Sequence, residues 1–418
     1  MNKIYRYFLL CFFTTSALFS QQVITWEQVL KEAKEKNPQL RQAELNLKQT
    51  ELKIALVKSE LYPQISFSFS SEKNYSENFE SKVNYSYNIS AGVTLLSGFS
   101  TINSLKSQLL DLQIAEENYK RVLSDIIFSL KESFINLYYT QEMYSLAENI
   151  FKRRKQNYEL IKLKYESGSE DLGSFLRVEA DMLQAEYELR KIKRERENAI
   201  RELLKNIGRD DFVDIKVETY SDLSSDIEKT IAQDGATIIA QIPEYKIKQY
   251  QLAKMQIQAK IAKSSFYPSL SFSANYGLSD TNPIPDKNKW SLSLGLRASY
   301  NIFSGFRDLT DLKIANNNIK TAEFELHNTK LNLINNFYIL KNNLIDIKES
   351  LIVKEKYLKA LEKQAEIVSI KYANGLALYY DWYQTEDSFI NTQKSLLDLK
   401  KELILSELNL KKFLGYLE

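Results

Sequence analysis

The chain has 418 residues, with 56 basic and 54 acidic side chains, one histidine and one cysteine. A charge so close to neutral gives no indication of nucleic-acid binding, and a single cysteine excludes an intrachain disulfide framework. The low content of glycine (11) and proline (6) is typical of long, uninterrupted elements.

Residues 1–20 have the pattern of a secretory signal peptide. Two basic residues precede an apolar stretch that ends at Leu18, and the small Ser20 suits cleavage. Cys11 lies inside the apolar stretch, so we expect it to be removed with the signal and the mature chain to be cysteine-free. No later stretch approaches 18 consecutive apolar residues, so we expect no membrane helix.

The rest of the chain is an internal duplication. Tyr62-Pro63 recurs as Tyr267-Pro268, 205 positions later. Other landmarks recur at an offset of 207: Ser97-Gly98-Phe99 as Ser304-Gly305-Phe306, Tyr165-x-x-Gly168 as Tyr372-x-x-Gly375, and Gly208 as Gly415. Landmarks in one order at nearly one spacing indicate two copies of one unit. We expect a first repeat at 21–208, an inter-repeat segment at 209–240 and a second repeat at 241–418.

Each repeat is predicted to contain one long helix and two shorter ones. Apolar residues recur every seven positions through 101–166 and 307–372 without Pro or Gly, which is typical of a coiled-coil helix of roughly 100 Å. Arg154 is one of the few polar residues that interrupt this lattice. The shorter helices are expected at 38–61 and 172–207 in the first repeat, and at 243–266 and 378–414 in the second.

Between the helices the apolar period changes to two, which predicts two β-hairpins. The expected strands are 64–75, 85–97, 268–279 and 289–302. One face of each strand is apolar with aromatic ends, and the other is small and polar. In the strictly alternating stretches, 65–70, 85–95, 270–278 and 290–302, Arg297 is the only charge. This pattern fits lipid on one side and a wet lumen on the other.

Four strands cannot close a barrel, and an open sheet edge is not tolerated in a bilayer. The chain must therefore oligomerise to complete the sheet. A dimer with eight strands and a trimer with twelve both satisfy this requirement. Because side chains fill the interior of an eight-stranded barrel, a conducting lumen favours the trimer.

The doubled motifs resemble those of the TolC family of outer-membrane efflux proteins. Asn37-Pro38 follows a short first helix, Tyr-Pro precedes each hairpin, Ser-Gly-Phe follows it, and Tyr-x-x-Gly stands at each helical turn. The resemblance implies a mainly α fold with a transmembrane β portion, closing as a homotrimer with a twelve-stranded β-barrel in the outer membrane and an α-helical barrel in the periplasm. It also implies a periplasmic adaptor (membrane fusion) protein and an inner-membrane pump as partners, besides outer-membrane lipid.

In that family the turns after Tyr-x-x-Gly form the periplasmic mouth, and acidic residues just beyond them narrow it. Asp381, six positions past Gly375, matches the principal gate acid. Gln384 stands where a companion acid is expected, Ser174 matches Asp381 in the first repeat, and Asp171 is displaced earlier. The resemblance therefore supports one ring of Asp381 rather than a two-ring gate. An acid in the first turn of a helix is also favoured by the helix dipole alone.

The two turns are also the expected site of adaptor docking. The candidate residues are Tyr165, Gly168, Tyr372, Gly375, Tyr380 and Trp382. Packing within the helical hairpins is an equally good interpretation of the aromatic residues, and the glycines also permit the backbone that ends a helix.

No motif indicates catalysis, a cofactor or a metal site. The chain has no nucleophile elbow or phosphate loop, and the lone His327 has no second histidine to share a metal with. Basic residues at 190–197 alternate with acids, as on a solvated helix face. We therefore expect a protein without enzymatic activity, and the family resemblance implies an exit duct of a tripartite efflux or type I secretion system. The alternative is a non-conducting trimeric coiled-coil structural protein or adhesin, which would have one apolar seam rather than two contact faces.

Overall fold

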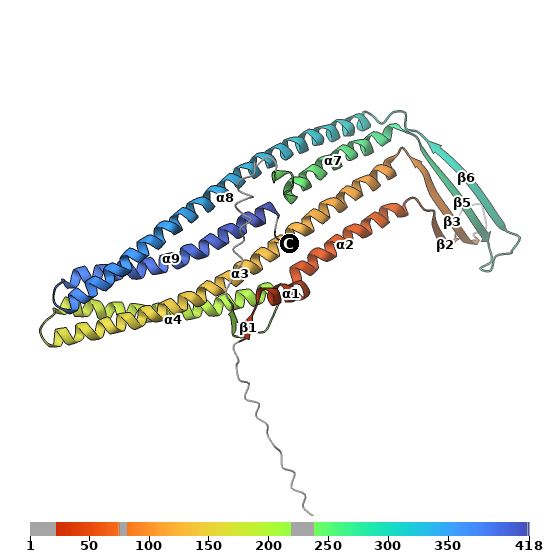
Figure 1. The fold of residues 1–418 in the computed structure, drawn as a ribbon. Coiled ribbons are helices and arrows are strands. Elements are labelled where there is room, and N and C mark those ends of the chain that lie inside the picture. The colour runs from red at the N-terminus through yellow and green to blue at the C-terminus, as the bar shows by residue number, and fades with distance from the viewer. Residues whose placement is uncertain (1–21, 74, 76–81, 219–237, 416, 418) are drawn as a thin grey trace, which may run out of the picture. The chain divides into compact units, whose positions relative to one another are not determined.

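The computed structural model describes residues 22–73, 75, 82–218, 238–415 and 417. The expected signal peptide (1–20) and residues 219–237 of the expected inter-repeat segment lie outside these residues. The chain is mainly helical, with one four-stranded antiparallel sheet and one two-stranded parallel sheet (Figure 1). No helix in the described part is both long and apolar enough to cross a membrane.

The two repeats match element by element. The long helices α3 (Ser100–Glu166) and α8 (Arg307–Ala373) each have 67 residues, and α4 (Leu172–Ile207) and α9 (Tyr379–Leu414) each have 36. Helices α2 (Pro38–Ser59) and α7 (Pro243–Lys263) precede the hairpins, and a 3-10 turn, η1 (Ser264–Phe266), follows α7.

The duplicated glycines adopt the same backbone conformation in both repeats. The values of φ are +60° and +66° at Gly98 and Gly305, and +95° and +77° at Gly208 and Gly415. A side chain is strained in this left-handed region. The landmarks therefore recur because each repeat turns its backbone at the same places.

The short first helix predicted before Asn37-Pro38 is present, but two short strands were not predicted. Strand β1 (Gln22–Ile24) pairs in parallel with β4 (Ile215–Val217), and helix α1 (Trp26–Lys36) begins at a capping box of Thr25 and Gln28. The Gln141 side chain binds both backbone groups of Val217, at 3.2 and 3.1 Å. Three-residue strands are too short for an alternating pattern to reveal them.

The described residues form two compact units, and neither unit is a repeat. Unit 1 contains the described residues within 1–37, 129–223 and 350–402, and unit 2 contains those within 38–128, 224–349 and 403–418. Each unit therefore takes elements from both repeats, because the long helices run through both units.

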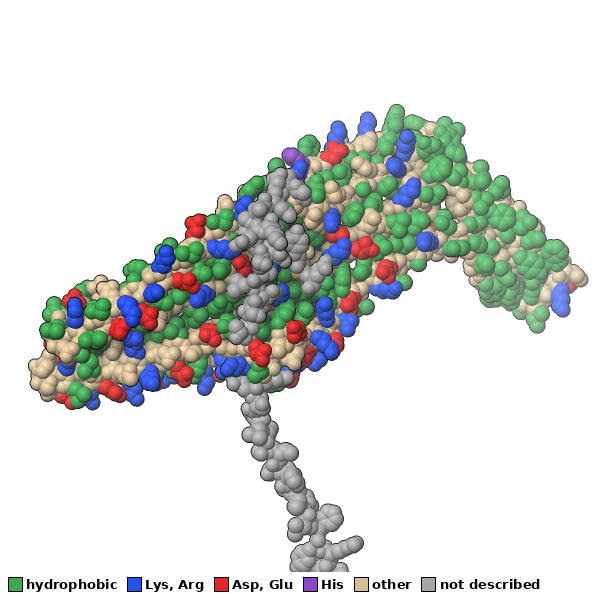
Figure 2. All heavy atoms as spheres, in the orientation of Figure 1, with side chains coloured by type: hydrophobic (Ala, Val, Ile, Leu, Met, Phe, Trp, Pro, Cys, Tyr) green, Lys and Arg blue, Asp and Glu red, His purple; other side chains and the backbone are tan. Residues whose placement is uncertain are grey.

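The sheet lies in unit 2 and joins both hairpins. Strands β2 (Gln64–Lys73), β3 (Val83–Ser97), β5 (Ser269–Asp280) and β6 (Trp290–Ser299) lie in that order, all antiparallel. The β3–β5 pairing unites the two repeats, which leaves β2 and β6 as the edges. Hydrophobic side chains gather over the sheet in Figure 2, whereas charged side chains are spread mostly over the helices.

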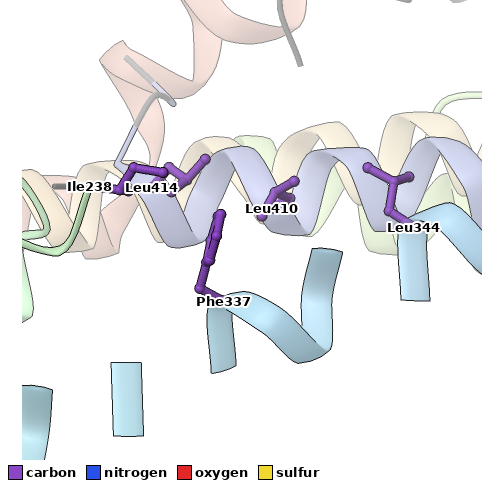
Figure 3. Close-up of a cluster of buried hydrophobic side chains, with 5 residues drawn as sticks. All are labelled: Ile238, Phe337, Leu344, Leu410 and Leu414. Carbon is purple, nitrogen blue, oxygen red and sulfur yellow. The ribbon is translucent and has the colours of Figure 1, made fainter. Parts of the chain in front are cut away.

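The hydrophobic core of unit 2 joins α8 to the last turns of α9. Ile238 packs with Phe337 and Leu344 of α8 and with Leu410 and Leu414 of α9 (Figure 3). Just beyond α9, a Cβ at Gly415 would lie 3.3 Å from the Pro243 ring, so the chain passes close to the start of α7.

Replacing Gly208 by alanine tests the need for close backbone approach after α4. The added Cβ would lie 2.6 Å from the Lys36 carbonyl oxygen. Gly168→Ala is the matched control, because it carries comparable strain (φ +76°) with no atom within 4 Å. We expect Gly208→Ala to lower the free energy of unfolding by about 2–4 kcal/mol, and Gly168→Ala to lower it by about 1 kcal/mol. Thermal unfolding in detergent measures the stability of both variants. Equal shifts in their unfolding temperatures would contradict the role of the contact between Gly208 and Lys36.

Candidate functional site: the two helical turns of unit 1

The turns that join α3 to α4 and α8 to α9 are closed by the same hydrogen bonds. The N–H of Gly168 donates to the Tyr165 carbonyl (2.9 Å), and that of Gly375 donates to the Tyr372 carbonyl (3.1 Å). In each turn the next N–H donates five residues back, which completes a Schellman motif. A Cβ at either glycine would meet no atom within 4 Å, so the space beside both turns is open. Figure 1 shows α4 returning beside the end of α3, and α9 beside the end of α8.

Two of the gate candidates, Asp171 and Ser174, lie together in a helix cap. Asp171 is the N-cap of α4, and its carboxylate accepts from the backbone N–H and the hydroxyl of Ser174, both at 2.9 Å. These hydrogen bonds, the backbone one foremost, hold the pKa of the Asp171 carboxyl below its usual value. Ser174 is buried. Asp171 and Ser174 therefore stabilise the N-terminus of α4, independently of any role in a gate.

The other two gate candidates, Asp381 and Gln384, are exposed near the start of α9. Three residues apart, they lie on one face of the helix. Asp381 makes no ion pair with any residue that the structure describes. Its carboxylate is thus available to ions or to another chain.

We call the two helical turns and the adjoining helix ends the tip. Trp382 and Tyr372 form the core of the tip rather than its surface. Their rings stack at 4.8 Å with an interplanar angle of 11°, and Trp382 is only 4% exposed. The Trp382 indole N–H donates to Ser369 Oγ (3.1 Å), and the Tyr372 hydroxyl donates to Glu170 Oε2 (2.6 Å). Burial and then this hydrogen bond raise the pKa of the Tyr372 phenol. For these two residues the structure favours the packing interpretation over docking.

The remaining tip candidates are accessible. Tyr380 is 67% exposed. Tyr165 is partly exposed and stacks on Phe175 at 5.1 Å. With the open space beside Gly168 and Gly375, they give a surface that carries both aromatic and backbone groups.

A partly buried polar network links α3 to α9, and the sequence analysis did not identify it. Arg153 donates twice to Glu386, with both N–O distances at 2.6 Å, and Ser369 Oγ donates to the same carboxylate (3.1 Å). Arg154 pairs with Asp387 (2.8 Å) and lies 3.9 Å from Asp181 on α4. The interruption of the apolar lattice at Arg154 was the available signal. It did not name the partners, which lie 233 positions away for Asp387.

The tip holds no evident metal centre. Among the residues that the structure describes, no three His, Cys, Asp or Glu side chains lie together in a group that could bind a metal ion. Three carboxylates of the tip accept hydrogen bonds instead: Glu386 from arginine, Glu170 from tyrosine and Asp171 from a backbone N–H.

Replacing Glu386 by glutamine tests the network between α3 and α9. The change keeps the shape of the side chain but leaves the Arg153 charge without its bidentate partner. We expect the free energy of unfolding to fall by about 1–3 kcal/mol, and the unfolding temperature to fall with it. Glu366→Gln is the control, because Glu366 pairs with Lys363 where both side chains are more than half exposed; that change should cost less than about 0.5 kcal/mol. Similar shifts for both variants would contradict the role of the network.

Solved structures with the same fold are outer-membrane channels. This chain superimposes on CusC with a TM-score of 0.82 and 18% identity; the match covers 93% of this chain and 91% of that chain. It matches VceC of Vibrio cholerae with a TM-score of 0.80 (17% identity, 93% and 95% covered). MtrE of Neisseria gonorrhoeae gives a TM-score of 0.81 (16% identity, 93% and 88% covered).

Sequence comparison agrees with the structural match. The cation efflux system protein CusC of Escherichia coli O157:H7 is 20% identical over 400 residues, which are 93% of this chain and 85% of that protein. The outer membrane efflux protein family model matches residues 29–209 and 240–416, one segment in each repeat. The family expected from the doubled motifs is thereby confirmed, and with it a channel rather than an adhesin. The chain belongs to the outer membrane efflux protein family and resides in the outer membrane.

Proposed function

We propose that this protein is the homotrimeric exit duct of a tripartite efflux or type I secretion system. In this proposal the sheets of three chains close a twelve-stranded barrel. An adaptor and an inner-membrane transporter open the tip of unit 1. The observation that carries the proposal is the pair of edge strands, β2 and β6, which no strand in the described part of the chain pairs on their outer sides. The inner strands of the same sheet already join two equivalent repeats.

The contact between the two repeats supplies a template for the contact between chains. Phe99 packs edge-on against Tyr267, with ring centroids 5.9 Å apart at 84°. The equivalent residues in the duplication are Phe306 and Tyr62, which are 66% and 67% exposed. If β6 pairs with β2 of a second copy as β3 pairs with β5, then Phe306 packs against Tyr62 of that copy.

Crosslinking between Tyr62 and Phe306 tests this contact. Cys11 is the only native cysteine, so Tyr62→Cys/Phe306→Cys protein carries a defined pair once the signal peptide is removed. With a short bis-maleimide we expect covalent products of two and three chains in outer membranes, and none larger. Each single variant is the control and should give no trimer. A series that stops at two chains would indicate an eight-stranded dimer, and absence of crosslinking would contradict the edge pairing.

We also propose that Asp381 narrows the mouth of the duct as a ring of three carboxylates. Its exposure, its lack of an ion pair in the described part of the chain and its place in the first turn of α9 support this role. Gln384 would add neutral lining on the same face, and Asp171 and Ser174 would hold the start of α4. The adaptor would contact Tyr165, Gly168, Gly375 and Tyr380, which are accessible.

Conductance through planar bilayers tests the duct and the gate separately. We expect wild-type trimers to conduct with a preference for cations, because a ring of carboxylates attracts them. Asp381→Asn should reduce this preference, and Asp381→Glu should keep it. An unchanged preference in Asp381→Asn would remove Asp381 from the gate. Absence of conductance in all three verified trimers would contradict the duct.

A further inference from the structure

One face of the four-stranded sheet is lined almost entirely by small, uncharged side chains. Residues paired across antiparallel strands point to the same face. The pairings therefore define rows across that face, with four residues in each complete row. Two such rows are Ser66, Ser90, Asn275, Ser293 and Ser68, Asn88, Gly277, Ser291.

Arg297 is the exception on this face. It pairs with Ser271, which in turn pairs with Thr94, beside the bulge between Thr94 and Leu96. Arg297 is exposed and makes no ion pair within the described part of the chain. The one other charged residue on the paired positions of this face is Glu72, which pairs with Asn84 at the hairpin end of its strand.

The position of Arg297 along the strands sets it apart from Glu72. Strand β6 runs from its hairpin at Trp290 to Ser299, shortly before α8 begins at Arg307. Arg297 therefore lies at the helix end of the sheet and Glu72 at the hairpin end. The two charges stand at opposite ends of an otherwise neutral surface, so Arg297 has no local carboxylate to cancel it on this face.

The geometry points to Arg297 as the residue that sets the local charge preference of the barrel lumen: three copies form a positive ring, at the helix end of the barrel, that favours anionic solutes there, whereas the proposed Asp381 ring favours cations at the mouth. This inference rests on the proposed trimer, which turns the polar face inward. The solutes it concerns carry carboxylate, phosphate or sulfonate groups.

The effect of such a ring follows from its surroundings. Arginine stays charged at any physiological pH. In a twelve-stranded barrel, intermediate between filled eight-stranded barrels and wide porins, an extended arginine side chain reaches well into the lumen. Charges in solution act over about 8 Å at physiological ionic strength, so three arginines on a neutral wall influence most of that cross-section.

A structural role for Arg297 makes a different prediction. A charge on an edge strand also discourages incorrect pairing with other sheets. That role would affect assembly, but it would not distinguish anions from cations at neighbouring positions. The sign of the effect is therefore the decisive measurement.

The test uses a cysteine at Ser271, directly across from Arg297, in the full chain inserted as trimers in liposomes. Two methanethiosulfonate reagents of similar size, one with a sulfonate and one with a trimethylammonium group, are added from the barrel side. The rate constants of modification give an anion-to-cation ratio. The ratio is measured with Arg297, with Arg297→Gln and with Arg297→Lys. Arg297→Ser, which matches the neighbouring residues of the face, serves if the glutamine variant does not assemble.

We expect the anion-to-cation ratio at Ser271→Cys to fall roughly threefold or more in Arg297→Gln and to persist in Arg297→Lys. At Ser291→Cys, on the same face but near the hairpin, the ratio should not change. An unchanged ratio at Ser271→Cys would overturn the inference and leave the duct intact. If Ser271→Cys and Ser291→Cys both resist modification while Leu292→Cys on the opposite face reacts, the polar face does not line water and the proposed barrel itself is wrong.

Discussion

Strands β2 and β6 each present one row of backbone N–H and C=O groups that no strand in the described part of the chain pairs. In water such an edge is tolerated, but in hydrocarbon each unpaired group costs several kcal/mol. In the proposed trimer, further copies of the chain pair with these edges. The duplication makes that possible, because the β3–β5 pairing inside one chain already shows how the second hairpin of one copy can meet the first hairpin of the next.

Both compact units combine apolar clusters with ion pairs between helices. In unit 2 the contacts near the chain's last helix are apolar, between α8 and α9. In unit 1, beside its apolar clusters, Arg153 and Arg154 reach across helices to carboxylates on α9, and the Tyr372 hydroxyl reaches Glu170. Ion pairs are directional, and they depend on geometry more steeply than apolar packing does. A small displacement of α9 relative to α3 would therefore abruptly weaken the pairs that Arg153 and Arg154 make.

Long periodic signals were readable from the sequence, and contacts between distant residues were not. The heptads over 101–166 and the alternation around Phe67 and Leu294 each extend over many residues, so they predict an element and its faces. Trp382 gave no such signal: an aromatic residue near a turn fits a surface or a core equally well, and only the stacking with Tyr372 decides. Glu386 looked like one more acid on a charged helix, because its partner Arg153 is 233 positions away. The pairing of β1 with β4 was missed because each strand is only three residues long.

The shared architecture of the two repeats has a consequence for how the ring of helices in the proposed trimer can change during evolution. A ring of six identical subunits would multiply every substitution sixfold, so no residue could differ between neighbouring positions. With two repeats in one gene, a substitution such as the one that distinguishes Asp381 from Ser174 appears only at alternate positions of a proposed trimer. In the proposed trimer, the duplication thus keeps an approximately sixfold backbone arrangement while the side chains follow threefold symmetry. A residue in one repeat can change without a change at the equivalent position of the neighbouring repeat.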